Sequence, residues 1–157
     1  MSEYSFDLDA FLAEPRPCQL ATNGPTIRTL DFLWEDGCFW IPSGPWAKLL
    51  DRVKKDPKVV LIVDTTEYST GRIYQVVASG DMEVMPYDVA RVRRMMTRYM
   101  GPDESKWSNS PTDYPGFVRD GGPPGAVLLK LKPKKLVANN FSYTRSPFAA
   151  KQCLRSY

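Results

Sequence analysis

The chain has 157 residues, of which 43% are apolar and 12% aromatic, so it is long enough and apolar enough to form one domain with a sizeable core. Its 21 basic and 18 acidic residues leave a net charge of only +3, which gives little support to nucleic-acid binding. Histidine is absent. Its absence excludes histidine metal sites and Ser-His-Asp or Cys-His catalysis, so we expect any chemistry to come mainly from a bound cofactor.

The sequence shows no signal peptide and no membrane span. The N-terminal segment is acidic and polar, and the longest purely apolar run, residues 59–63, is far too short to cross a bilayer. We therefore expect a cytoplasmic protein that binds neither membrane nor nucleic acid. The three cysteines, Cys18, Cys38 and Cys153, are an odd number at wide spacings, which argues against a disulfide framework and against a zinc site. No metal ligand set is predicted.

The first part of the chain predicts a short helix followed by three strands. The helix is expected over residues 7–13 and the strands over 18–22, 26–34 and 38–41. The Asn-Gly-Pro sequence at 23–25 is a strong turn signal, and Glu-Asp-Gly at 35–37 predicts a tight hairpin. The strands on either side of that hairpin are therefore expected to be antiparallel neighbours.

The hexapeptide from Ser43 to Lys48 leads into a helix. Apolar residues with helical spacing follow at Trp46, Leu49, Leu50 and Val53. Ser43 is predicted to be the N-cap, Pro45 fits the first turn, and Asp56 before a proline ends the helix. Free backbone N–H groups, a hydroxyl and Lys48 at a helix start suit a phosphate or other anion. The alternative is an ordinary surface lysine on an amphipathic helix.

The middle of the chain predicts two more strands and a second long helix. The strands are expected over 58–65 and 72–85, with a bend or bulge at Gly80. The helix follows over residues 88–100 and ends at a Gly-Pro pair. One side of this helix is apolar, and the other is expected to be a solvated face that carries Arg91, Arg94 and Arg98.

A change of composition marks the last third of the chain. Residues 103–125 are rich in Pro, Gly, Ser and Asp and are expected to form a long loop that is either mobile or covers a site. A strand with one buried and one wet face is predicted over 126–137, and residues 138–157 show no period. About six strands with two long helices indicate either a small antiparallel barrel or a sheet with helices at one end.

The order and spacing of several short motifs resemble the pyridoxamine 5′-phosphate oxidase-like family of split β-barrel proteins. The match spans residues 8–137, and its motifs are Asn23-Gly24-Pro25, Thr26 to Phe32, Glu35-Asp36-Gly37, Phe39-Trp40-Ile41, Ser43 with Lys48, Asp56-Pro57-Lys58-Val59 and Val77-Ala78-Ser79-Gly80. The segment from Arg98 to Gly101 is similar to one in the deazaflavin-dependent branch of that family.

The resemblance implies a mainly β fold, namely a six-stranded antiparallel split β-barrel of the FMN-binding type with flanking helices. Residues 1–157 would form a single domain, with its core at about 8–137, the long loop at 103–125 and a tail at 138–157. It also implies a homodimer with a flavin-type cofactor at the interface between the two copies.

The same resemblance supplies candidate site residues. It implies that two strands flank the cofactor ring and that Lys48, together with Arg28, holds the phosphate. The cofactor-binding candidates are Arg28, Thr29, Leu30, Trp40, Ile41, Pro42, Ser43, Trp46, Ala47 and Lys48. The substrate-side candidates are Gln75, Arg98, Trp107 and Tyr114. No catalytic residue is predicted.

Two of these predictions have alternatives. Arg28 is either a second phosphate ligand or an exposed residue of an edge strand. Trp40 and Trp46 are either ring-stacking residues or residues of the core or of a dimer contact.

The expected function is FMN-dependent hydride transfer to or from a small organic substrate. The Arg-x-His pair with which pyridoxamine phosphate oxidases bind substrate is missing, so oxidation of vitamin B6 is not expected. One alternative is a reductase that uses the deazaflavin coenzyme F-420, whose lactyl and oligoglutamate tail requires further positive charge, available at Lys54, Lys55, Lys58 and the helix face from Arg91 to Arg98. Another is a non-catalytic protein that binds flavin or haem.

Overall fold

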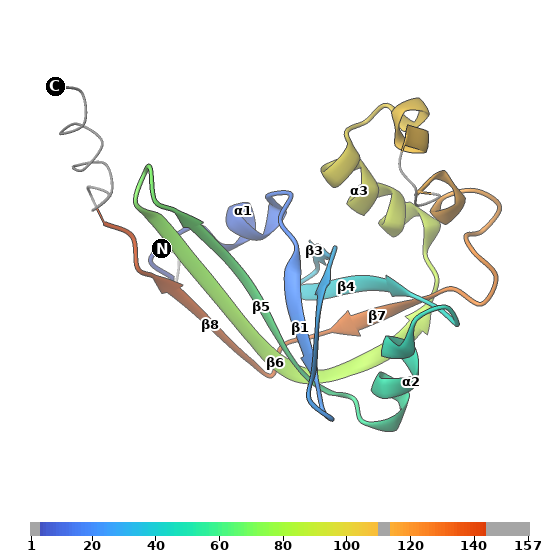
Figure 1. Cartoon of the computed structure of the whole chain (residues 1–157), viewed down its shortest axis with the longest axis horizontal. Coiled ribbons are helices and arrows are strands. Elements are labelled where there is room, and N and C mark those ends of the chain that lie inside the picture. The colour runs from blue at the N-terminus through green and yellow to red at the C-terminus, as the bar shows by residue number, and fades with distance from the viewer. Residues whose placement is uncertain (1–3, 110–113, 144–157) are drawn as a thin grey trace, which may run out of the picture.

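The computed structural model describes residues 4–109 and 114–143, which form a strongly bent antiparallel sheet with helices packed at its ends (Figure 1). The helices are α1 (Leu8–Ala13), α2 (Lys48–Lys55) and α3 (Val89–Met100), with two short 3-10 helices, η1 (Glu104–Asn109) and η2 (Tyr114–Phe117). The strands are β1 (Cys18–Thr22), β2 (Thr26–Leu30), β3 (Leu33–Glu35), β4 (Cys38–Ser43), β5 (Lys58–Glu67), β6 (Arg72–Pro86), β7 (Val127–Leu131) and β8 (Lys135–Asn140). The predicted mainly β barrel architecture is confirmed.

Strand β6 is long enough to join two parts of the sheet. Its residues 72–81 pair with β5, and its residues 82–86 pair with β7. The change of partner lies beside Gly80, where the absence of a side chain lets the backbone of Lys132 and Lys134 approach closely. The strand order is β2-β1-β5-β6-β7-β4-β3, with β8 on β6. The bend predicted at Gly80 therefore turns one strand around the barrel core.

The described residues form eight strands, whereas the sequence predicted six. The expected strand over 26–34 is interrupted because the Phe32 N–H donates to Tyr99 Oη at 3.2 Å and its carbonyl accepts from Arg98 and Tyr99. The expected strand over 126–137 is interrupted at Pro133, which has no N–H to donate to a ladder. Each long prediction therefore becomes two shorter strands.

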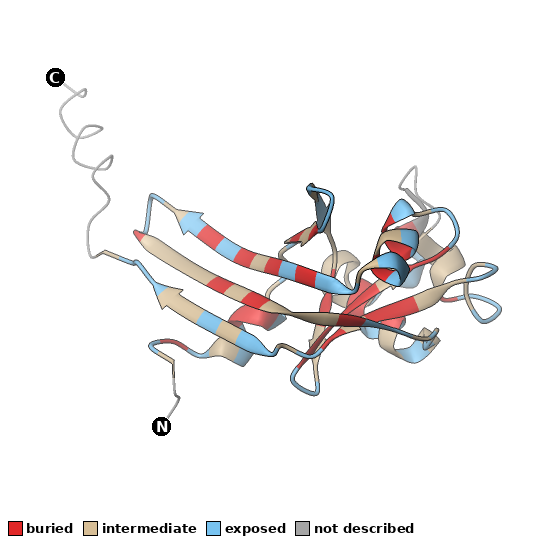
Figure 2. Cartoon of the chain, turned by 90° about the horizontal axis from the view of Figure 1, so that it is seen from below, coloured by how far each residue is buried: buried red, intermediate tan, exposed pale blue. Residues whose placement is uncertain are grey.

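The apolar side chains gather in two cores. The first fills the barrel and includes Val59, Leu61 and Val63, which alternate along β5 with more exposed residues, as the colour bands of Figure 2 show. The second lies between α3, the long loop and the barrel wall, and contains Met95 and Trp107. Helices α2 and α3, each predicted to have an apolar side, therefore pack that side against a core.

Helix α2 begins later than the sequence predicted. Its N-cap is Ala47, which has no capping side chain, and Ser43 is the last residue of β4 instead of a cap. Trp46 lies in the turn before the helix and is 52% exposed, so it does not extend the buried stripe of the helix. Leu49, Leu50 and Val53 are buried as predicted.

The long loop is partly ordered by η1 and η2. Trp107 is fully buried, and its indole N–H donates to the Gly101 carbonyl at 3.0 Å. Residues 110–113 of this loop and 144–157 of the predicted tail lie outside the described residues. Within the described part of the chain, none of the helices combines the length and the apolar character needed to cross a bilayer.

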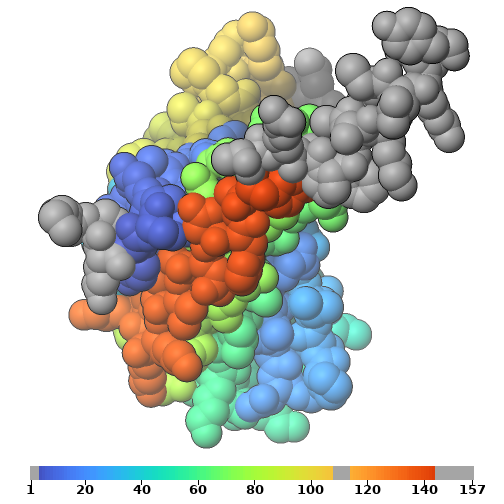
Figure 3. Space-filling view, turned by 90° about the vertical axis from the view of Figure 1, so that its left-hand side faces the viewer, coloured from blue at the N-terminus to red at the C-terminus, as the bar shows by residue number. Residues whose placement is uncertain are grey.

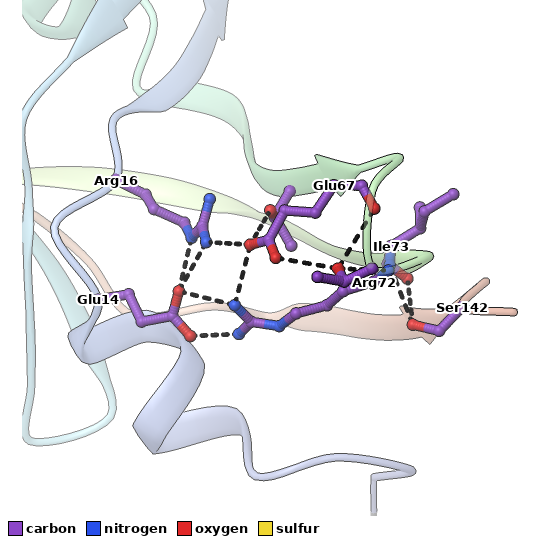
Figure 4. Close-up of polar contacts among 8 residues, drawn as sticks. Glu14, Arg16, Glu67, Arg72, Ile73 and Ser142 are labelled. Carbon is purple, nitrogen blue, oxygen red and sulfur yellow. Dashed lines mark hydrogen bonds and ion pairs between the residues drawn. The ribbon is translucent and has the colours of Figure 1, made fainter. Parts of the chain in front are cut away.

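A cluster of four charged side chains ties the end of α1 to the hairpin between β5 and β6 (Figure 4). Arg16 lies 2.8 Å from Glu14 and 3.0 Å from Glu67. Arg72 lies 3.2 Å from Glu67 and also pairs with Glu14.

In the end-on view of Figure 3 the N-terminal segment lies against β8, and Phe6 stacks on Tyr74 of β6 at 4.2 Å between ring centroids.

Candidate functional site

A pocket of about 340 Å³ lies where β2, the end of β4 and the start of α2 meet, and we call it the cradle. Most of the predicted cofactor-binding residues line it. Its lining residues are Arg28, Leu30, Pro42, Ser43, Trp46, Ala47, Lys48 and Leu49. Residues from two separate strands and one helix start, which the resemblance grouped together, are therefore neighbours in space.

The path of the chain explains the position of each group. Strand β4 pairs with β7 as far as Ser43, and the turn that follows is closed by a hydrogen bond from the Ala47 N–H to the Gly44 carbonyl at 3.0 Å. A Cβ at Gly44 would overlap the Trp46 ring, so only glycine lets that ring lie over the turn. On β2, Arg28 pairs with the buried Leu20, so it shares the barrel-facing side of its strand.

The cradle has a positive electrostatic character. Helix α2 begins at Lys48, and its N-cap Ala47 has no side chain that accepts from the first turn. The first N–H groups of a helix have no intrahelical partner and carry the positive end of the helix dipole. Lys48 and Arg28 add two formal charges to the lining. The arrangement therefore suits an anion with several acceptor oxygens, such as a phosphate.

The Ser43 hydroxyl is the most specific feature of the cradle. Ser43 is only 1% exposed, and its Oγ makes no hydrogen bond within the described residues. Buried polar atoms in folded proteins are nearly always hydrogen-bonded, and a missing partner requires an explanation. A phosphate oxygen in the cradle would accept from this hydroxyl. The residues present therefore fit a phosphate-bearing cofactor.

The other predicted cofactor-binding residues lie elsewhere. Thr29 is exposed on the opposite side of β2 and bonds to Gln19 at 3.0 Å. Ile41 is 1% exposed and packs in the barrel core. Trp40 packs in the second core, donates to the Glu35 carbonyl at 3.0 Å and carries the guanidinium of Arg91 3.7 Å above its ring. For Trp40 the core alternative agrees with its surroundings.

The substrate-side candidates do not gather at the cradle. Arg98 is not on a solvated face, because it donates to the carbonyls of Leu12 and Phe32 and fastens the end of α3 to the barrel. Trp107 is buried in the second core, and Tyr114 packs against that core. Gln75 accepts from Asn139 on β8.

Two hollows beside the cradle were not predicted. The basic groove has a volume of about 680 Å³ and is lined by Asn23, Gly24, Lys48, Asp51, Arg52, Lys55 and Asp56. The aromatic hollow, also about 680 Å³, is lined by Trp46, Gly116, Phe117, Arg119, Asp120, Gly122, Pro123 and Pro124. The helical spacing of Lys48, Arg52 and Lys55 in the sequence predicts that they share one face of the helix. The residues of the long loop carried no comparable signal.

Thiol chemistry is not available near the barrel core. Burial raises the pKa of Cys18 to about 12, so this side chain stays a protonated thiol at neutral pH. Within the described residues no three His, Cys, Asp or Glu side chains gather as a metal site would require.

This chain is similar to known proteins in its structure. No protein-family model and no curated protein matches it. A putative pyridoxamine 5′-phosphate oxidase from Listeria innocua is similar in structure, with a TM-score of 0.57 and 17% identity over 82% of this chain and 92% of that chain. An F-420 reductase gives a TM-score of 0.58 and 16% identity over 85% and 98%. The haem storage protein HutZ from Vibrio cholerae gives a TM-score of 0.61 and 14% identity over 85% and 92%.

Proposed function

Because the chain has the split β-barrel fold of pyridoxamine 5′-phosphate oxidase-like proteins, we propose that its cradle binds the phosphate of a flavin-type cofactor for an oxidoreductase reaction. The observation that carries the proposal is the buried Ser43 hydroxyl, which has no hydrogen-bond partner among residues 4–109 and 114–143 and lies beside Lys48 and Arg28 at a helix start. The 16% identity to an F-420 reductase supports the fold alone, so the residues of the cradle carry the functional argument.

The roles of the chain's own residues follow from their positions. Ser43 would donate a hydrogen bond to a phosphate oxygen, and Lys48 with the first N–H groups of α2 would balance the charge of the phosphate. Leu30 and Pro42 add apolar side chains to the lining of the cradle. When bound, a flavin-type cofactor supplies hydride transfer between its ring and a small organic substrate. The protein then contributes position, electrostatics and exclusion of water.

FMN is the first candidate cofactor, since it ends at its phosphate and requires no positive charge beyond that of the cradle. The basic groove favours a second candidate, coenzyme F-420. Lys48 lines both the cradle and the groove, and Arg52 and Lys55 continue the positive stripe along α2. An oligoglutamate tail leaving the phosphate would meet this stripe. Asp51 and Asp56 line the same groove and offset part of its charge.

We also propose that two copies of the chain associate through the outer face of β2, β1 and β5. Ile27 is 66% exposed and Val60 is 41% exposed. Both pair with Ala21 of β1, so the three residues form one apolar row across the sheet. Exposed apolar surface of this kind is typical of a protein interface.

The proposal is tested by titrating the purified chain with FMN or F-420 and following the fluorescence of the ring. Lys48→Ala is expected to raise the dissociation constant about tenfold to hundredfold, because a charge-assisted contact is lost. Lys54→Ala removes a lysine of the same helix that lines neither pocket, and should change nothing. Absence of binding by both cofactors would refute the proposal, as would equal affinity of the Lys48 variant and the wild type.

The same titration separates the two cofactors. The double variant Arg52→Gln/Lys55→Gln should lower the affinity for F-420 and leave the affinity for FMN unchanged, because only F-420 has a tail that extends beyond the phosphate. Turnover is then measured with the loaded protein and an artificial electron acceptor. A protein that retains cofactor but reduces no acceptor would be a binding protein without catalysis.

A further inference from the structure

The aromatic hollow and the cradle share one lining residue, Trp46. We propose that this hollow binds a planar aromatic or conjugated organic molecule. Its description as the substrate depends on the proposed oxidoreductase function, whereas its binding does not.

The aromatic wall is exposed and held in place. Trp46 is 52% exposed, although a tryptophan is among the side chains that gain most from burial. Its ring lies on the backbone of Gly44, where a Cβ would overlap it. The ring of Phe117 meets it edge to face, with centroids 6.0 Å apart and planes at 90°. The two rings therefore present a fixed aromatic corner to the hollow.

The other side of the hollow is equally well anchored. The Tyr87 hydroxyl donates to the Phe117 carbonyl at 2.8 Å, and Arg93 donates to the next carbonyl, that of Val118, at 3.2 Å. The backbone at Gly122 packs so closely on the Tyr87 ring that any Cβ there would overlap it. These contacts join the loop to the segment around α3. The hollow is therefore preformed, as ligand sites usually are.

The lining decides the class of ligand. Two rings and two prolines provide apolar faces, while Gly116 and Gly122 add no side chain to the space. Arg119 and Asp120 are exposed at the edge and carry opposite charges, so the lining as a whole has no net charge. The volume of about 680 Å³ lies within the rough range of 300–1,000 Å³ for small-molecule sites. A flat, mainly apolar molecule gains most from such walls.

The backbone conformation of Asp120 is a second unusual feature of the loop. Its φ of 48° lies in the left-handed region, which costs free energy for a residue with a side chain. Gly121 and Gly122 follow with φ of 82° and 89°. The chain therefore turns through left-handed backbone at residues 120–122, two of which line the hollow.

The test measures the binding of naphthalene-2-carboxamide to the full chain by calorimetry, with decahydronaphthalene-2-carboxamide as a probe of the same skeleton that is not flat. We expect the flat probe to bind more tightly. Phe117→Leu should raise the dissociation constant of the flat probe about threefold to tenfold, since it removes one aromatic contact. Phe141→Leu changes an exposed phenylalanine that does not line the hollow, and should leave binding unchanged.

Equal affinity for the two probes, or an unchanged affinity in both Phe117→Leu and Trp46→Leu, would overturn the inference. Circular dichroism of each variant separates loss of binding from loss of fold. The outcome is also distinct from that of the proposed function. Failure of FMN and F-420 to bind removes the cofactor proposal, and the carboxamide titration still decides whether the hollow is a ligand site.

Discussion

The Ser43 hydroxyl is a group whose removal should separate binding from stability. It is buried and makes no hydrogen bond within the part of the chain that the structure describes, so no hydrogen bond there stabilises the fold through it. Ser43→Ala is expected to leave the free energy of unfolding unchanged or slightly raised. The same variant should bind the cofactor about tenfold to hundredfold more weakly, because it loses one hydrogen bond to the charged phosphate.

Urea unfolding and cofactor titration of the same preparation check this prediction. Ser79→Ala, on a strand away from the cradle, serves as the control and should bind the cofactor as the wild type does. A clear loss of stability in Ser43→Ala without cofactor would mean that the hydroxyl has a structural role.

At the scale of elements, the charged cluster between α1 and the β5–β6 hairpin makes stability depend on pH. The hydrogen bond from Arg72 holds the pKa of Glu14 below its ordinary value of 4.5. A carboxyl with a lowered pKa stabilises the fold above its ordinary pKa, and that contribution is lost as the pH falls through the lower, folded-state value. We expect the free energy of unfolding to decrease below about pH 4.5.

The variant Glu14→Gln tests the source of that decrease. It should be less stable at pH 7 by about 1 kcal/mol or less, since partly exposed ion pairs contribute little. Its stability should also fall less steeply on acidification. Urea unfolding at a series of pH values measures both, and parallel curves for the variant and the wild type would exclude Glu14 as a contributor.

The elements also show what the sequence could and could not predict. The turn signal at residues 23–25 predicted the end of β1, and the apolar run from residue 59 to 63 predicted β5 with its observed first residue, Lys58. The break at Phe32 was not predictable, since its cause is a hydrogen bond from a distant side chain, Tyr99. The break at Pro133 was predictable from the sequence, because proline has no N–H to donate to the neighbouring strand.

One part of the candidate site was likewise predictable from the sequence, and another part was not. Arg28, Ser43 and Lys48 were predicted from motif resemblance, and they meet in the cradle. The aromatic hollow was missed because its walls join a turn and a loop that are far apart in sequence. Trp46 was placed on the buried stripe of α2, because spacing alone does not show that the helix begins after it.

At the scale of the whole molecule, the apolar row on the outer face predicts self-association. Val60→Asp should convert the expected dimer to a monomer, because it places a charge at one end of the apolar row. Thr66→Asp, an exposed position farther along β5, should leave the association state unchanged. Sedimentation equilibrium at micromolar concentration measures both variants. A monomeric wild-type chain would remove the dimer proposal.

The position of Trp46 has a thermodynamic consequence. Because Trp46 lines both the cradle and the aromatic hollow, a ligand that contacts it in one pocket changes the free energy of binding in the other. Such coupling is reciprocal: the factor by which the first ligand alters the affinity for the second equals the factor in the opposite direction. The single tryptophan between two pockets would then make their occupancies cooperative or mutually exclusive without movement of the barrel.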